Sequence, residues 1–238
     1  MTPTLAIAAR EFLACFRTAA GPVVIALFAA LAGAFVALAV ITPGAPAELR
    51  GFFAVSQWLA LIIAPAISMR LIADELRANT IEPLRASPIS EWHIALGKLL
   101  GSFAFYNAVL LPTLAFPILL AALTDIEPAP IITGYLGLLL LGLTYLSVGL
   151  FASSLTDSQV VAFLLTFAFF IALWVATGPG AQLLGPPLDQ PLFALSIQHR
   201  LAPFAAGVID LTAALFFLTF ASIALLLTVI SLQWRHWR

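Results

Sequence analysis

The stretch MRLIADELRANTIEPLRASPISEWHIALGK, Met69–Lys98, holds eight of the twenty-one Asp, Glu, Lys and Arg residues of a 238-residue chain. Uncharged apolar runs flank it, with Phe52–Met69 before it and Leu99–Leu123 after it. Each run is close to the length of about 20 residues that a helix needs to cross the hydrocarbon core of a membrane. The stretch is therefore predicted to connect two membrane-spanning helices and to lie outside the hydrocarbon.

The composition of the whole chain supports this prediction, because 63% of the residues are hydrophobic, 9% are charged and the mean hydropathy is +1.11. A soluble domain carries roughly a quarter charged residues, so too few polar side chains remain to cover a surface in water. The net charge of −1 does not indicate a nucleic-acid partner, and membrane lipid is the expected surrounding. The sequence predicts an all-α integral membrane protein with a single transmembrane domain, residues 1–238. Six windows without a charged residue or histidine are the expected spans: Pro22–Ile41, Phe52–Met69, Leu99–Leu123, Gly134–Ala152, Val160–Thr177 and Leu211–Leu232.

Two segments outside these windows have apolar residues of their own. In residues 1–21, apolar residues recur at helical spacing, which predicts an amphipathic helix at the membrane interface or, alternatively, a simple extension of the first span. The first window is longer than the core of a signal peptide, so we expect it to be retained as a span. The proline-rich segment 178–210 is predicted to form short interfacial or re-entrant helices before the last span, as a gate, a docking site or a structural plug.

The distribution of Lys and Arg predicts the orientation, since these residues concentrate on the cytoplasmic side. With six crossings and a cytoplasmic N-terminus, only Arg50 and Arg200 lie outside. Both termini and residues 70–98 are therefore expected in the cytoplasm, and the chain is expected in the inner membrane of a bacterial cell. The eight residues on the cytoplasmic side are Arg10, Arg17, Arg70, Arg77, Arg85, Lys98, Arg235 and Arg238.

The segment 70–98 is longer than a simple connection between two spans requires. Helical character is expected to continue past Met69 with its charged side chains turned to water or headgroups, to stop at Asn79, and to resume after Thr80 as an N-cap. Ser90 is expected to cap the helix that leads into the third span. A surface that docks a cytoplasmic protein explains the length of the segment, and a membrane-surface elbow without a partner is the alternative. The side chains expected to face water or headgroups at its start are Arg70, Asp74, Glu75 and Arg77.

Three stretches resemble type-2 ABC exporter permeases, most closely the gliding-motility-associated (GldF-like) branch. PAISMRLIADELRANTIEPLRASPISEWHIALGKLLGSF, Pro65–Phe103, is similar to the cytoplasmic loop of that family, although Asn79 stands where the family usually has glycine and Pro83 where a helix former is usual. Arg10–Phe35 is similar to the interfacial helix and first span, and Gly134–Phe169 to the fourth and fifth spans. The positions that carry the resemblance are Pro65, Met69, Arg70, Ala73, Asp74, Glu75, Thr80, Ile81, Glu82, Ser87, Pro88, Gly97 and Lys98, together with the turn Ser153, Ser154, Leu155, Thr156 and Gln159.

The resemblance implies that the chain is a permease that works with a separate cytoplasmic ABC ATPase, present in two copies. It also implies a second permease copy and, in this branch, a membrane-anchored outer accessory protein. No cofactor is expected in this chain, and ATP and Mg would be bound by the ATPase. The residues that the resemblance places at the ATPase-coupling interface are Asp74, Glu75, Arg77, Thr80, Glu82 and Arg85.

Other classes of function remain open on the residues alone. The chain has no Gly-x-x-x-x-Gly-Lys-(Ser/Thr) loop, so it does not hydrolyse ATP through such a loop itself. An ion-coupled secondary transporter or channel is one alternative, although the six windows lack the ionisable groups that coupling usually requires. An intramembrane enzyme is another, and the single cysteine, Cys15, is expected to be an apolar filler. Candidate residues for an enzyme are His93, His199, His236, Asp189 and Asp210.

Overall fold

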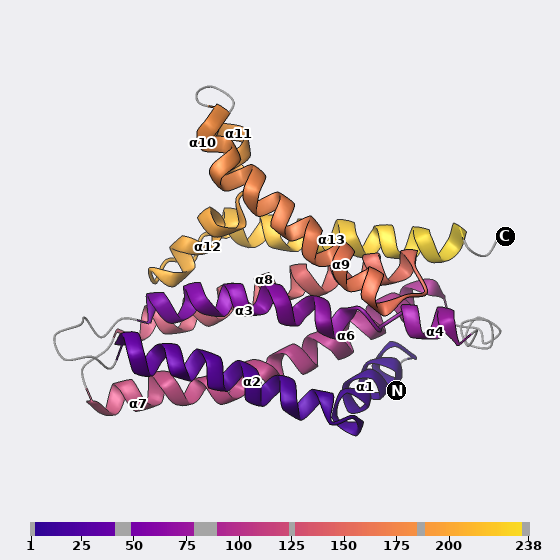
Figure 1. The fold of residues 1–238 in the computed structure, drawn as a ribbon, viewed down its shortest axis with the longest axis horizontal. Coiled ribbons are helices and arrows are strands. Elements are labelled where there is room, and N and C mark those ends of the chain that lie inside the picture. Colours follow the sequence, from indigo (N-terminus) through magenta and orange to yellow (C-terminus); the bar gives the residue numbers. More distant parts are fainter. Residues whose placement is uncertain (1–2, 41–48, 79–89, 124–126, 185–188, 235–238) are drawn as a thin grey trace.

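The computed structural model describes residues 3–40, 49–78, 90–123, 127–184 and 189–234. Within these ranges every regular element is a helix (Figure 1). Six helical stretches in the described part of the chain are long and apolar enough to cross a membrane. The predicted all-α fold with six spans is thus confirmed. The stretches are Gly21–Leu38, Arg50–Arg77, Glu91–Ala122, Pro128–Leu155, Gln159–Leu183 and Leu211–Trp234.

The N-terminal helix α1 (Pro3–Arg17) is separate from α2 (Ala20–Phe35), which continues as the π-helical turn η1 (Val36–Val40). The chain turns sharply between the two helices, where a side chain on Gly21 would overlap the carbonyl oxygen of Cys15. The first span is therefore not simply extended at its N-terminus. Instead α1 lies across the end of the bundle and packs mainly on α6 (Figure 1).

A short separate helix follows the second span, and a 3-10 turn interrupts the third span. Helix α3 (Arg50–Ser68) leads through a turn into the short α4 (Ala73–Arg77). The third span consists of α6 (Glu91–Leu110), a 3-10 turn η2 (Leu111–Leu114) and α7 (Ala115–Leu123). Pro112 lies in η2 and lacks the backbone N–H that an α-helix uses. This accounts for the change from α-helix to 3-10 turn.

Helix α6 begins directly after Ser90, as predicted, and therefore eight residues before the apolar window that starts at Leu99. The prediction that the Ser90 side chain caps it is wrong, because no capping hydrogen bond forms. The Ser90 hydroxyl instead bonds Nδ1 of His93 at 2.5 Å.

The central helix of the bundle is α8 (Pro128–Leu155), which contacts α3, α6, α9, α12 and α13. A small residue allows α8 to pack closely on α6, since a side chain on Gly142 would overlap the ring of Tyr106 on α6. The Tyr106 hydroxyl donates to the Leu138 carbonyl oxygen at 3.2 Å. In lipid, where apolar burial does not drive helices together, such close packing and interhelical hydrogen bonds hold a bundle.

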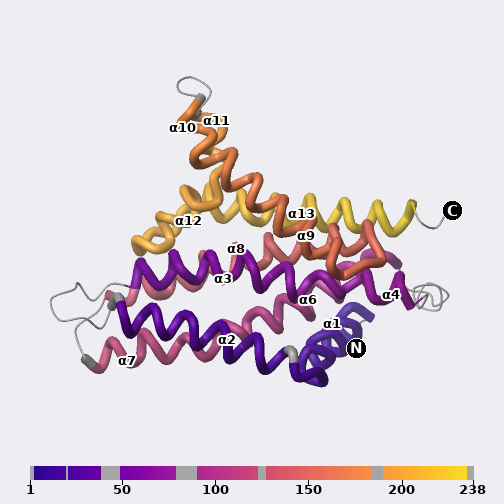
Figure 2. The backbone as a smooth tube through the Cα atoms, viewed as in Figure 1, coloured from indigo at the N-terminus to yellow at the C-terminus, as the bar shows by residue number. Residues whose placement is uncertain are grey.

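The predicted short helices of segment 178–210 are present. Helix α9 (Gln159–Val175) continues through the π-helical turn η3 (Ala176–Gly180) into α10 (Ala181–Leu184), so it runs past the predicted end at Thr177. Figure 2 shows α10 and α11 projecting sideways from the bundle, while α12 returns toward it and leads to α13. The Thr133 hydroxyl of α8 donates to the Phe204 carbonyl oxygen of α12 at 2.6 Å, which fixes that return. The last three helices are α11 (Asp189–Ala194), α12 (Ile197–Ala205) and α13 (Leu211–Trp234).

Candidate functional site

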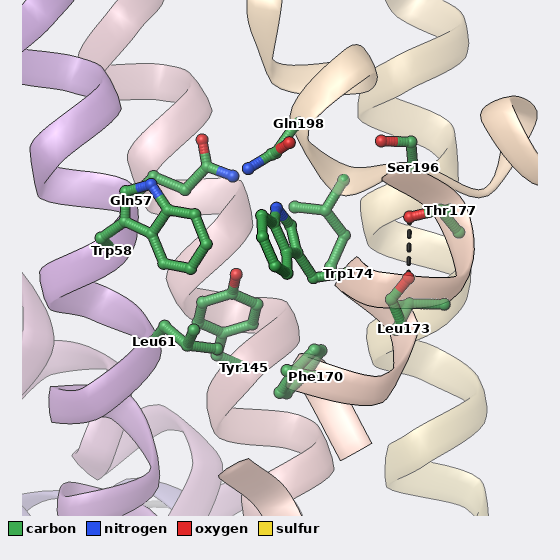
Figure 3. A pocket seen from close by; sticks show the side chains of 11 residues that line it. Gln57, Trp58, Leu61, Tyr145, Phe170, Leu173, Trp174, Thr177, Ser196 and Gln198 are labelled. Carbon is green, nitrogen blue, oxygen red and sulfur yellow. Dashed lines mark hydrogen bonds between the residues drawn. The ribbon is translucent and has the colours of Figure 1, made fainter. Parts of the chain in front are cut away.

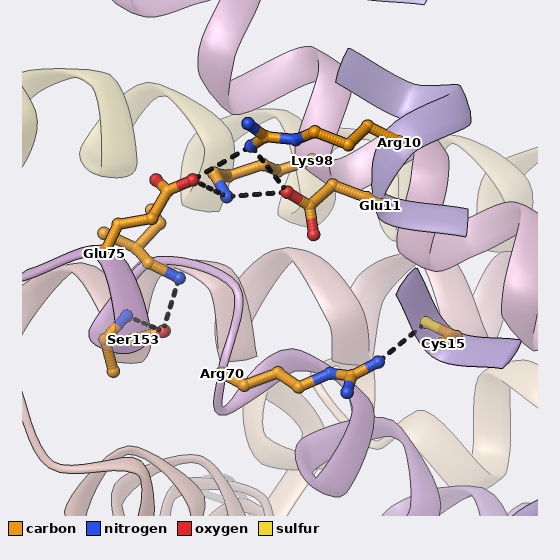
Figure 4. Close-up of polar contacts among 9 residues, drawn as sticks. Arg10, Glu11, Cys15, Arg70, Glu75, Lys98 and Ser153 are labelled. Carbon is orange, nitrogen blue, oxygen red and sulfur yellow. Dashed lines mark hydrogen bonds and ion pairs between the residues drawn. The ribbon is translucent and has the colours of Figure 1, made fainter. Parts of the chain in front are cut away.

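Four charged side chains from three helices meet at the end of the bundle where α1 and α4 lie (Figure 4). Arg10 and Glu11 come from α1, Glu75 from α4 and Lys98 from α6. The Lys98 Nζ lies 2.9 Å from Glu75 Oε1 and 3.0 Å from Glu11 Oε1. The Arg10 Nη2 lies 3.0 Å from Glu75 Oε1 and 3.1 Å from Glu11 Oε1. Two carboxylates and two cations therefore form a neutral group, which we call the four-charge cluster.

Most of the four-charge cluster is shielded from solvent. The Lys98 side chain is 1% exposed, Glu75 is 15% exposed and Glu11 is 16% exposed. Removing one partner from a buried ion pair leaves an uncompensated charge, which is strongly destabilising. Each buried member consequently requires the others to be in place, and the cluster ties α4 to both α1 and α6.

The electrostatics of α1 follow from this arrangement. Burial raises the pKa of Glu11, but the ion pairs with Lys98 and Arg10 outweigh burial and leave that pKa below its ordinary value. For Arg10, burial lowers the pKa while the bonds to Glu11 and Glu75 raise it, and the net pKa is raised. Both shifts favour the charged forms that the cluster needs.

The pKa shift of Glu11 predicts a pH dependence of stability. A depressed carboxyl pKa stabilises the folded state above the unfolded pKa of about 4.3, and this contribution is lost as pH falls through the folded value. We expect Glu11→Gln to lower the free energy of unfolding by about 2 kcal/mol at pH 7. This difference from the wild type should shrink as the pH falls below about 4.

Unfolding of the purified protein in graded SDS at several pH values measures this difference. The control is Glu127→Gln, which changes an exposed glutamate. It should change stability by less than about 0.5 kcal/mol. A Glu11→Gln deficit that is the same at pH 7 and pH 3.5 would show that the charge of Glu11 contributes nothing.

Close packing of α1 on α6 brings Glu11 to Lys98. Two glycines one helical turn apart form the contact surface of α6, where a Cβ on Gly97 would lie 2.7 Å from Cβ of Ile7. A Cβ on Gly101 would lie 2.6 Å from the backbone oxygen of Ala8. This Gly-x-x-x-Gly spacing lets two helix backbones approach.

The turn between α3 and α4 is held by α8. The Ser153 hydroxyl accepts hydrogen bonds from the backbone N–H groups of Ile72, at 3.0 Å, and Ala73, at 2.9 Å. It also donates to the Met69 carbonyl oxygen at 2.9 Å. One side chain thus satisfies three backbone groups where α3 ends and α4 begins. The last turn of α8 is therefore directly bonded to the turn before α4.

Two further contacts join this region to α9 and α1. The Gln159 amide at the start of α9 donates to the carboxylate of Asp74. The Arg70 guanidinium donates to Sγ of Cys15 on α1 at 2.9 Å. Cys15 is buried as a filler should be, but its sulfur also accepts this bond. Burial raises the pKa of the Cys15 thiol more than the Arg70 charge lowers it.

The predicted coupling residues differ in how far the structure exposes them to solvent. The prediction that Glu75 faces water or headgroups is wrong, because Lys98 and Arg10 draw its carboxylate into the protein. Asp74 is half-buried against Gln159, and Arg77 is exposed. The remaining predicted positions lie outside the described residues: Asn79, Thr80, Glu82, Pro83 and Arg85.

Sequence reasoning missed Arg10, Glu11 and Lys98 as members of one cluster. A signal existed, since Lys98 stands directly before an apolar window and Glu11 is the only acidic residue before Glu48. A lone carboxylate and a lone cation on packed helices of a membrane protein are expected to pair with each other. The pairing itself is not visible in sequence, because the two residues are 87 positions apart.

The described residues considered for an enzyme do not all meet in one place, although His199 and Asp210 line one pocket together with Arg200. His93 lies at the start of α6, whereas His199 lies in α12. Asp210 accepts a hydrogen bond from the backbone N–H of Thr212 at 2.8 Å and so caps α13. No group of three or more His, Cys, Asp or Glu residues in the described ranges is placed to hold a metal ion. His236 lies outside those ranges, and the structure does not describe the side chain of Asp189.

The fold and the site define a multi-pass membrane protein in which a short helix, α4, follows the second span and is held in place by polar contacts. Residues 29–206 match the family described as ABC-2 family transporter protein. Because the match covers most of the chain, the protein belongs to this family and is the membrane-embedded permease of an ABC transporter. Comparison with curated proteins found no match.

Proposed function

We propose that the chain couples ATP hydrolysis by a separate cytoplasmic ABC ATPase to export, or to force transmission, across the membrane. The observation that carries this proposal is the anchoring of α4. Its sequence neighbours and its own residues are bonded to α1, α6, α8 and α9, while Arg77 at its end is exposed. A push on α4 would therefore move several helices together, as a rigid-body transition requires.

Within this proposal the predicted coupling residues have two kinds of role. Arg77 would contact the ATPase directly, as would Thr80, Glu82 and Arg85. Glu75 would be a positioning residue that holds α4 against Lys98 and Arg10, and Asp74 would do the same through Gln159. ATP and Mg would bind to the ATPase and not to this chain.

The rest of the assembly follows from the resemblance to exporter permeases. Two permease copies and two ATPase copies would form the transporter, with a membrane-anchored outer protein in the manner of the gliding-motility-like branch. Eight of ten Lys and Arg residues on one side support cytoplasmic termini in a bacterial inner membrane.

Co-purification with a Walker-motif ATPase tests the coupling proposal. We expect the ATPase to be recovered with the wild-type permease from native membranes in mild detergent, because α4 and the segment after it form its docking surface. Arg77→Glu should reduce the recovered ATPase about tenfold, as the loss of one charged contact would. The measurement is the ratio of ATPase to permease in the eluate.

The matched control is Arg17→Glu, which reverses an exposed arginine at the end of α1 and should leave the ratio unchanged. Equal loss in both variants would show a non-specific charge effect and contradict docking at α4. If no ATPase is recovered with the wild type under several mild conditions, the ion-coupled transporter becomes the better hypothesis.

A further inference from the structure

A pocket of about 410 Å³ lies at the corner between α11, α12 and the start of α13, in the half of the protein away from α4 (Figure 1). It is lined by His199 and Arg200 of α12 and by Asp210, which stands directly before α13. The proposed coupling to an ATPase uses none of these three residues. The volume falls in the range of about 300–1,000 Å³ that small-molecule sites occupy.

The packing of α12 turns His199 and Arg200 into this pocket. Leu201 is buried in the protein, and Gln198 turns toward Trp58 in a narrow cleft between α3 and α9 (Figure 3). These two contacts fix which side of α12 faces the bundle. His199 and Arg200 consequently lie on the other side of the helix, where they line the pocket.

Two contacts hold the Arg200 guanidinium in place. Its Nε donates to the Ala194 carbonyl oxygen at 3.0 Å, and its Cζ lies 5.1 Å from the centroid of the Phe216 ring. Such a distance is within the roughly 6 Å at which a cation and an aromatic ring attract each other. Among the described residues, none accepts a hydrogen bond from the two terminal nitrogens. These nitrogens present the planar fork of donors that matches the oxygens of a phosphate.

The pocket also contains the opposite charge. One oxygen of the Asp210 carboxylate accepts the backbone N–H of Thr212 at 2.8 Å, and no cation in the described part of the chain pairs with this carboxylate. Arg200 and Asp210 therefore line one pocket without neutralising each other. A simple anion would meet the like charge of Asp210, and a simple cation that of Arg200. A ligand that carries a phosphate and an ammonium group complements both.

The surroundings of the pocket indicate that this ligand is a lipid. Leu211 is the first residue of the 24-residue span α13, so the pocket lies where the hydrocarbon of the membrane begins. Val208, Ile209 and Leu211 are large apolar side chains, and all three are exposed beside Asp210. They offer a surface to acyl chains, which a small dissolved ligand does not have.

We propose that this pocket binds the headgroup of a phosphoethanolamine lipid. The phosphate is held by the Arg200 guanidinium with a ring N–H of His199, the ammonium group by the Asp210 carboxylate, and the acyl chains lie against Ile209 and Leu211. The site goes beyond the proposed coupling function, because it is complete in one chain and needs neither ATP nor the ATPase.

Native mass spectrometry of the full-length permease in mild detergent tests the proposal, with dioleoyl phosphatidylethanolamine and dioleoyl phosphatidylglycerol titrated separately. The phosphatidylethanolamine should bind about tenfold more tightly, because phosphatidylglycerol has no ammonium group to offset the charge of Asp210. Asp210→Asn should abolish this preference by weakening the first lipid and strengthening the second. Asparagine caps a helix as well as aspartate does, so α13 should still begin at the same place.

Two matched variants and one soluble competitor complete the test. Arg200→Gln should weaken both lipids about tenfold, because both carry the phosphate. Asp157→Asn changes an exposed aspartate between α8 and α9 and should leave both affinities unchanged. Free phosphoethanolamine at the concentration of the lipid should not displace it, since it lacks the acyl chains.

Three results would overturn the proposal: equal binding of the two lipids to the wild type, an unchanged preference in Asp210→Asn, or displacement by free phosphoethanolamine. The first and third use only the wild-type protein, so the test is decided even if a variant fails to fold. Each of them would leave the recovery of the ATPase intact. A failure to recover the ATPase would likewise leave lipid binding intact, so the two failures are distinguishable.

Discussion

Replacing Lys98 with methionine is expected to lower the free energy of unfolding by about 3 kcal/mol, the lower end of the cost of breaking a buried ion pair. Lys98 is 1% exposed and bonds both carboxylates of the four-charge cluster. After the change, Arg10 alone would face Glu11 and Glu75, so one buried negative charge would be uncompensated. Methionine keeps the length and apolar stem of lysine, which limits the effect to the charge. Unfolding in graded SDS measures the difference.

Two further variants separate the charge effect from packing. Arg10→Gln leaves the same excess negative charge, but the Arg10 side chain is 52% exposed, so water replaces its contacts and the change should cost less than about 1 kcal/mol. Adding Glu75→Gln to Lys98→Met removes the excess negative charge and should recover more than half of the lost stability. If Lys98→Met costs no more than Arg10→Gln, the cluster does not hold α4 in the way described.

The features that the sequence predicted well were those that depend on long, uniform runs of residues. Six apolar windows predicted six spans, and the start of α6 after Ser90 and the separate helix α1 followed from local patterns. Only the apolar windows are strong signals, because a membrane allows few alternatives to a helix for a run of about 20 apolar residues. The short helices before α13 were expected from proline spacing, but their positions were not.

The site was predictable only in part, because its contacts join residues that are distant in sequence. Arg10 and Glu75 are separated by 65 positions, and Asp74 and Gln159 by 85. A five-residue helix with charges on several sides does not indicate which charge faces inward. The assumption that charged residues near a membrane face water placed Glu75 outside, whereas two cations on other helices hold it inside.

Gly101→Ala is expected to undock α1 from α6. A Cβ at this position would lie 2.6 Å from the backbone oxygen of Ala8 and 2.7 Å from Cβ of Glu11, and neither atom can rotate aside as a side-chain tip can. Helix α1 must then move away, which takes Glu11 from Lys98. The expected loss of stability is about 2 kcal/mol, within the range for overpacking.

The single cysteine reports this undocking directly. Cys15 is 3% exposed on α1, so a maleimide can react with it only when α1 opens. Gly101→Ala should raise the labelling rate of the folded protein more than tenfold, since each 1.4 kcal/mol changes the opening equilibrium by a factor of ten. Gly178→Ala is the matched control, because a Cβ there would meet no atom within 4 Å, and its labelling rate should equal that of the wild type. Equal rates in all three proteins would mean that the contact between α1 and α6 is looser than the glycine spacing indicates, and that Glu11 is held to Lys98 by charge alone.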